Sequence, residues 1–102
     1  MIHLADVMTL AQQKLGPSAR YFYAVARNAD GTKTCSAEVF TSARAGANVP
    51  DAEKTSRVVG TAPFIGTFVD ENQQVRRDAG QADAIDALHV ELEKLPDVAA
   101  GG

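Results

Sequence analysis

The chain has 102 residues and a formal net charge of −3 at pH 7, with 45% hydrophobic and 23% charged residues. This length fits one domain, and the composition excludes a wholly disordered chain. The acidic charge balance argues against a general attraction to nucleic-acid phosphates. The single cysteine, Cys35, excludes an intramolecular disulfide.

The N-terminus and the apolar runs of the chain predict a cytoplasmic protein. The first ten residues, MIHLADVMTL, have no basic region and contain Asp6, which is unlike a secretory signal peptide. No apolar run approaches the ~20 residues that span a bilayer, so we expect no membrane partner. The lone thiol is compatible with a reducing compartment. The abundance of alanine is typical of proteins from GC-rich genomes and favours a bacterial or phage source.

Residues 3–15 predict the first helix. Apolar residues recur there at spacings of three and four and share one face, which consists of Leu4, Val7, Met8, Ala11 and Leu15. Gly16 can adopt the positive φ that ends a helix, and Pro17 cannot continue one.

Segments 20–28 and 32–40 flank the dipeptide Asp30-Gly31 and predict a β-hairpin. A two-residue Asp-Gly loop favours a type I′ turn. This turn pairs Phe22 with Val39 and fixes the rest of the register. One face of the hairpin is then wholly apolar and carries Phe22, Ala24, Ala26, Cys35, Ala37 and Val39. We expect this face to pack in the core.

The opposite, outer face of the hairpin then gathers aromatic and apolar side chains, namely Tyr21, Tyr23, Val25 and Phe40. Clustered exposed aromatics often mark an interaction surface. The alternative is that a loop or the C-terminal part of the chain covers this face.

Residues 41–56 are small, polar and turn-rich, and they predict a long loop. Strand regions follow at 57–61 and 64–69, with Pro63 between them at a bulge, an edge or a break. Residues 73–77 predict a short return strand.

Residues 79–95 predict the last helix, which Pro96 ends. Its buried stripe comprises Ala82, Ile85, Leu88, Leu92 and Leu95. The same helix carries carboxylates at Asp83, Asp86, Glu91 and Glu93. They fit a solvated face, and alternatively an acidic surface for a basic partner.

Together these elements predict an α+β fold. We expect a two-layer sandwich, in which a small, mainly antiparallel sheet packs on an N-terminal and a C-terminal helix. The sheet would consist of the β-hairpin and one or two further strands. We expect a single domain over residues 1–96 and a flexible tail over residues 97–102.

No residue pattern indicates catalysis, a cofactor or a metal. Cys35 falls on the expected core face, where a free cysteine packs as a small hydrophobe. One cysteine with the distant His3 and His89 does not make a zinc site. Gly60 and Gly66 lie in strand regions, where they fit bulges or close backbone contacts rather than a phosphate-binding loop.

These observations predict a small non-enzymatic interaction or regulatory module, such as a bacterial or phage accessory protein. It would bind a protein partner or a second copy of itself through the outer face of the hairpin. The residues that we expect at this interface are Tyr21, Tyr23, Val25 and Phe40.

The alternative is a nucleic-acid-binding domain. The order helix, hairpin, strand, helix resembles that of double-stranded-RNA-binding domains, whose second helix begins with lysines that bind phosphate. Here that position reads RRDAGQADA, two arginines followed by acids, and the loop after the hairpin is longer, so the resemblance covers element order only. The residues of this alternative site are Arg44, Arg57, Arg76 and Arg77.

Overall fold

The computed structural model describes residues 2–46, 48–64, 68, 69, 72, 73, 75, 76 and 79–98. The elements run in the order α1 (Leu4–Leu15), β1 (Arg20–Arg27), β2 (Lys33–Ser42), the 3-10 helix η1 (Asp51–Glu53), β3 (Lys54–Pro63), β4 (Phe68–Val69), β5 (Val75–Arg76) and α2 (Ala79–Glu93).

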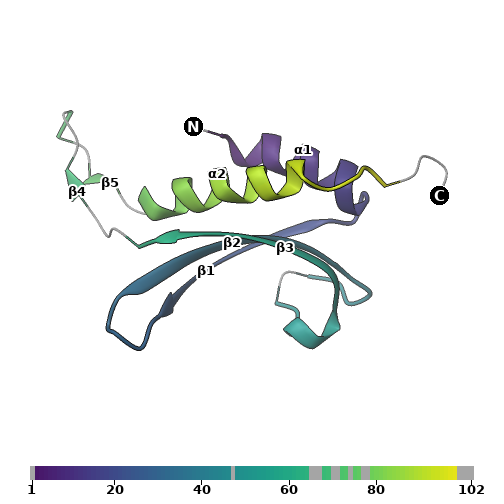
Figure 1. Cartoon of the computed structure of the whole chain (residues 1–102), viewed down its shortest axis with the longest axis horizontal. Helices are drawn as coiled ribbons and strands as arrows, with labels where there is room; N and C mark the ends of the chain where they lie inside the picture. Colours follow the sequence, from purple (N-terminus) through teal and green to yellow (C-terminus); the bar gives the residue numbers. More distant parts are fainter. Residues whose placement is uncertain are drawn as a thin grey trace.

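The molecule has two layers. β1, β2 and β3 form an antiparallel sheet with β2 in the centre, while β4 and β5 pair separately. Figure 1 shows α1 and α2 on one face of the sheet and η1 on the opposite side. We call the covered side the helix face and the other side the outer face. The predicted α+β sandwich is confirmed.

The core lies between the helices and the helix face. It consists of small and branched apolar side chains from both layers, including Val7, Ala11, Cys35, Ala37, Val39, Ala62, Ala84, Ile85, Leu88 and Leu92. The predicted burial of Cys35 is confirmed.

α1 matches the predicted first helix to within one residue. Val7 and Ala11 are its buried residues. The helix ends at Gly16, which has a φ of 111° and donates its N–H to Gln12 O at 3.0 Å.

The segment after α2 is bonded to α1. Lys14 Nζ donates to Leu95 O at 2.7 Å and lies 2.8 Å from Asp97 Oδ1. Val98 N donates to Gln13 O at 2.9 Å. The contacts of the domain therefore continue to Val98.

α2 packs directly on the backbone of β3. A Cβ on Gly60 would lie 2.1 Å from Leu88 N and 2.5 Å from Ala84 O. Gly60 thus lets the backbones of β3 and α2 come into close contact, which is one of the two roles expected for it. Similarly, a Cβ on Gly80 would lie 2.7 Å from Cys35 Sγ.

The register of the hairpin differs by one residue from the prediction. Tyr21 pairs with Val39, and Phe22 pairs with Glu38. Because side chains alternate between the two faces of a sheet, a shift by one residue turns β1 over. The predicted register, with Phe22 opposite Val39 on the core face, is wrong.

The shift affects β1 alone, because the helix-face residues of β2 are the same in both registers. Tyr21, Tyr23 and Val25, predicted on the outer face, lie on the helix face. Phe22, Ala24 and Ala26, predicted in the core, lie on the outer face.

The turn explains the shift. A type I′ turn needs a positive φ at both Asp30 and Gly31, but of these two only Gly31 has one, at 88°. Asp30 Oδ1 instead accepts hydrogen bonds from Thr32 N at 3.0 Å and Thr32 Oγ1 at 2.6 Å. Gly31 N donates to Asn28 O at 3.1 Å, and Asn28 N donates to Thr32 O at 2.7 Å. The loop therefore has three residues, 29–31.

The long loop is shorter than predicted because strands extend into it from both ends. β2 continues to Ser42 and β3 begins at Lys54, so residues 43–53, which include η1, form the connection. Pro63 ends β3, at an edge of the sheet. The predicted return strand is present as β5, which pairs with β4.

Candidate functional site

The residues predicted as a binding patch do not form one surface. Tyr21 and Tyr23 pack against the core on the helix face, and Gln81 Nε2 of α2 donates to Tyr21 Oη at 3.2 Å. Val25 shares their face and is exposed. Phe40 lies on the predicted outer face but is fully buried there. The structure therefore contradicts the positions that led to this patch.

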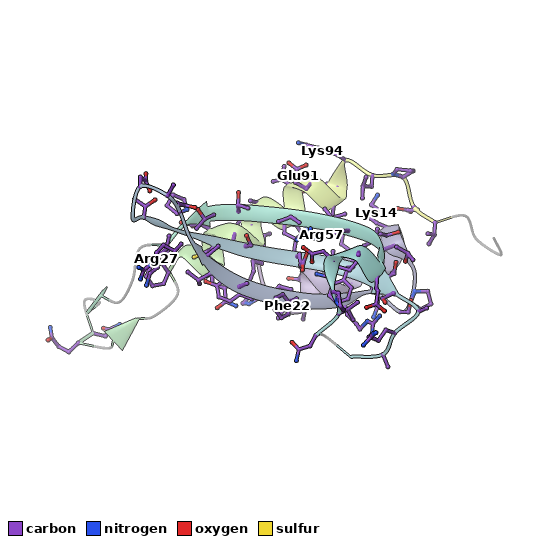
Figure 2. All side chains as sticks on the ribbon, turned by 90° about the horizontal axis from the view of Figure 1, so that it is seen from below. Lys14, Phe22, Arg27, Arg57, Glu91 and Lys94 are labelled. Carbon is purple, nitrogen blue, oxygen red and sulfur yellow. The ribbon has the colours of Figure 1, made fainter. Side chains whose placement is uncertain are left out.

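The outer face instead forms a cleft between the sheet and η1, which we call the outer-face cleft. It encloses about 430 Å³. Its sheet side is formed by β1, β2 and β3, and its other wall by the segment before η1. The lining residues that matter below are Phe22, Ala24, Glu38, Asp51, Lys54 and Arg57. Figure 2 looks onto this face and shows Phe22 and Arg57 on the two edge strands.

Glu38 is the buried acid of the cleft. It lies in the middle of the central strand and is only 4% exposed. Its Oε1 accepts a hydrogen bond from Lys54 Nζ at 2.5 Å, and its Oε2 accepts one from Arg57 Nε. Both partners come from β3, the strand beside it. A buried carboxylate needs such paired cations, because desolvation of an isolated charge is costly.

Lys54 connects the sheet to η1. Its side chain is 4% exposed, and Nζ lies 2.9 Å from Asp51 Oδ1 as well as against Glu38. The ammonium also lies 4.6 Å from the ring centroid of Phe40 and 5.7 Å from that of Phe22. Burial lowers the pKa of Lys54, but hydrogen bonds to Asp51 and Glu38 outweigh it and raise the pKa. Lys54 is therefore a charged group fixed in place.

Another cation, Arg20, holds the segment that leads from β2 to the wall of the cleft. Arg20 donates from Nη1 to Arg44 O and Gly46 O, each at 2.7 Å, and from Nη2 to Ser42 O at 3.1 Å. Its guanidinium also lies 5.3 Å from the ring centroid of Phe40. This explains why Phe40 is buried on the face opposite α1 and α2: the chain after β2 folds over it.

The charges in the cleft balance. Two carboxylates, Glu38 and Asp51, face two cations, Lys54 and Arg57. The hydrogen bond from Lys54 and the charge of Arg57 lower the pKa of Asp51. A neutral, partly apolar cleft beside an aromatic ring suits the side chains of another protein better than a polyanion.

The arginines of the alternative site are divided between two ends of the molecule. Arg44 Nη2 lies 2.9 Å from Glu53 Oε1, and Arg57 pairs with Glu38 in the cleft. The backbone of Arg76 belongs to β5, which lies at the opposite end from η1 in Figure 1. Arg77 lies outside the described residues. The described part of the chain thus does not gather these residues into one basic surface.

The other chemistry-bearing residues lie in separate environments. His3 precedes α1 and is exposed. His89 Nδ1 lies 2.9 Å from Glu93 Oε1, one turn away on α2. Among the described residues, no three His, Cys, Asp or Glu side chains are grouped so as to hold a metal ion.

The carboxylates of α2 point in different directions. Asp86 Oδ1 accepts a hydrogen bond from Ile2 N at 2.9 Å, on the side of α1. Glu91 Oε1 lies 3.0 Å from Lys94 Nζ. Asp83 and Glu91 are both exposed.

Sequence reasoning missed the ion pairs of Glu38. The available signal was a glutamate between Ala37 and Val39, in a strand whose neighbours are buried. Its partner Lys54 cannot be assigned from the sequence, which predicts a loop over residues 41–56, where the structure has the start of β3.

Comparisons with known protein families, curated proteins and solved structures found no match for this chain. In the part of the chain that the structure describes, neither helix has the length and apolar character needed to cross a membrane.

Proposed function

We propose that this protein is a non-catalytic interaction module that binds a protein partner, or a second copy of itself, in the outer-face cleft. The observation that carries this proposal is the cleft itself: Phe22 stands half-buried beside a buried ion pair on the face that the helices leave uncovered. An aromatic anchor next to fixed polar groups is a common form of binding hot spot.

The same observations favour binding over catalysis. Both oxygens of Glu38 are occupied by cations, and Cys35 packs in the core against the backbone of Gly80. A cytoplasmic accessory or regulatory protein of a bacterium or phage fits such a module. We assign it no cofactor.

Site-specific photo-crosslinking in the source cells tests this proposal. A benzophenone side chain at Ala24, on the floor of the cleft, should crosslink to one protein or to a second copy. The matched control carries the same group at Val90, which is 50% exposed on α2. Equal crosslinking from both positions would argue against the cleft.

The captured protein is then purified and its affinity measured directly. Phe22→Ala should weaken binding at least about tenfold, as expected for an aromatic hot spot, and Val90→Ala should leave it unchanged. Unchanged affinity of the Phe22→Ala protein would refute the assignment of the cleft.

A further inference from the structure

The outer edge of β3 presents backbone groups to solvent, and two hydrogen bonds define which ones. Phe64 N donates to Lys33 O at 3.0 Å, and Asn28 N donates to Thr32 O at 2.7 Å. Hydrogen-bonded and non-bonded residue pairs alternate along antiparallel strands. The first bond makes Lys33 and Phe64 a bonded pair, so the odd-numbered residues of β2 bond to β3. The second makes Asn28 and Thr32 a bonded pair, so the even-numbered residues of β2 bond to β1. On β3, residues 58, 60 and 62 therefore bond to β2.

The N–H and C=O groups of the intervening residues, Arg57, Val59 and Thr61, point away from the sheet. β3 is an edge strand. Within the described part of the chain, no backbone hydrogen bond reaches these outward groups. A row of such groups can pair with a strand from another chain.

The flank of α2 above this edge is also open. At about 100° per residue, Ile85 and Glu91 lie at equal angles on either side of Leu88, which faces the sheet. Ile85, on the side of α1, is 8% exposed, whereas the side chain of Glu91 is 46% exposed. Figure 2 shows Glu91 and Lys94 beyond β3, on the side away from β1.

The side chains on this flank are two exposed carboxylates, one small residue and one cation, Lys94, whose Nζ lies 3.0 Å from Glu91 Oε1. Asp83, Ala87 and Glu91 follow one another at spacings of four, so they form a single row along α2. A strand that pairs with β3 would lie below this row. Its side chains on the helix face would meet Ala87 between two carboxylates that outnumber the one cation beside them, which favours a basic segment.

A second copy of this chain at the same edge would bring its own α2 beside this one. Only the odd-numbered residues of β3 direct their N–H and C=O groups to the open edge, so each would pair with an odd-numbered residue of the other copy. The side chains of these residues lie on the outer face in both copies. Both α2 helices would therefore lie on the same side of the joined sheet. The two β3 strands would lie about 4.8 Å apart, whereas packed helices need about 8–10 Å, so a self-paired edge requires each α2 to stand partly over β2, which it also contacts.

We propose that β3 pairs with an extended, basic segment of a protein partner, which adds a strand to the sheet. This site goes beyond the outer-face cleft and uses different atoms: the outward backbone of Arg57, Val59 and Thr61, and the carboxylates of Asp83 and Glu91. Backbone pairing provides affinity, and the carboxylates select the charge of the segment.

A synthetic peptide, acetyl-TKTVTKT-amide, is the probe. Its two lysines are about 13 Å apart when extended, close to the ~12 Å between Asp83 and Glu91 along the helix, and its valine falls below Ala87. Amide exchange of Arg57, Val59 and Thr61 should slow about tenfold at saturating peptide. The control peptide, with glutamate in place of both lysines, should bind at least about tenfold more weakly.

Two variants separate the backbone from the charge. Val59→Pro removes an outward N–H without removing a bond to β2, and it should abolish peptide binding. Asp83→Lys combined with Glu91→Lys changes only exposed side chains, so it keeps the test valid if the proline variant fails to fold. This second variant should reverse the preference between the two peptides.

Three results would overturn the proposal. The first is unchanged exchange at Arg57, Val59 and Thr61 with saturating peptide. The second is protection of β1 amides instead, and the third is a dimer that protects the β3 edge without peptide. Phe22→Ala should bind the peptide normally, so failure at the edge is distinguishable from failure of the outer-face cleft.

Discussion

Gly60 determines how closely the two layers approach. A methyl group there would meet the main chain of α2 at Leu88 and Ala84 rather than a movable side chain. The helix must then shift, and contacts along its buried stripe are lost together. We expect Gly60→Ala to destabilise the protein by about 3 kcal/mol, the upper part of the range for overpacked cores. Urea unfolding measures this difference.

The neighbouring residue provides the control for this substitution. Thr61 is exposed and lies on the opposite face of β3. Thr61→Ala should change stability by no more than about 0.5 kcal/mol. If Gly60→Ala proves equally mild, α2 does not pack on the backbone of β3 as described.

At the scale of elements, the hairpin shows how far sequence reasoning reached. The strands, the antiparallel pairing and the buried face of β2 followed from alternation and from turn residues. β1 could not be oriented in the same way, because residues 21–26 are apolar on both faces. The orientation then depended on the turn alone, where the side chain of Asp30 bonds to Thr32 and closes a three-residue loop.

The same limit explains the candidate site. The predicted register places Phe22 on the wrong face, and no pattern in the sequence assigns partners to Glu38. Those partners lie more than ten residues away in sequence, across a loop whose path depends on tertiary contacts. Local patterns carry no information about such pairs.

We expect the attachment of η1 to the sheet to depend on pH. Hydrogen bonding from Lys54, with the charge of Arg57, keeps the pKa of Asp51 below its ordinary value of 3.8. A carboxyl with a lowered pKa in the folded state contributes stability above its unfolded pKa and loses it as pH falls through the folded pKa. Wild type should therefore be more stable than Asp51→Asn at pH 7, and the difference should vanish in acid.

Urea midpoints of the two proteins, measured between pH 7 and pH 2, check this expectation. The two curves should converge as pH falls below about 4. A gap that stays constant over this range would mean that the carboxylate charge of Asp51 does not hold η1.

At the scale of the whole molecule, the two ends of the chain stabilise each other. Asp97 pairs with Lys14, and Val98 N bonds to Gln13 O. A chain that ends at Pro96 loses both contacts, whereas one that ends at Val98 keeps them. We expect the shorter chain to be about 1–2 kcal/mol less stable, from one hydrogen bond and one partly exposed ion pair.

Thermal unfolding of these two truncated chains makes the comparison. The shorter chain should melt about 4–8 °C lower for each kcal/mol lost. Equal melting temperatures would show that the contacts with α1 contribute nothing to the fold.

The order of elements also has a consequence for biosynthesis. α1 leaves the ribosome well before α2, which packs beside it over the same sheet and follows it by five strands in the chain. At about 5–20 residues per second, α2 follows α1 after roughly 3–13 s. During that interval the apolar side of α1, with Val7 and Ala11, has only part of its packing surface available. We therefore expect each nascent chain to expose a hydrophobic segment for several seconds before the fold can cover it.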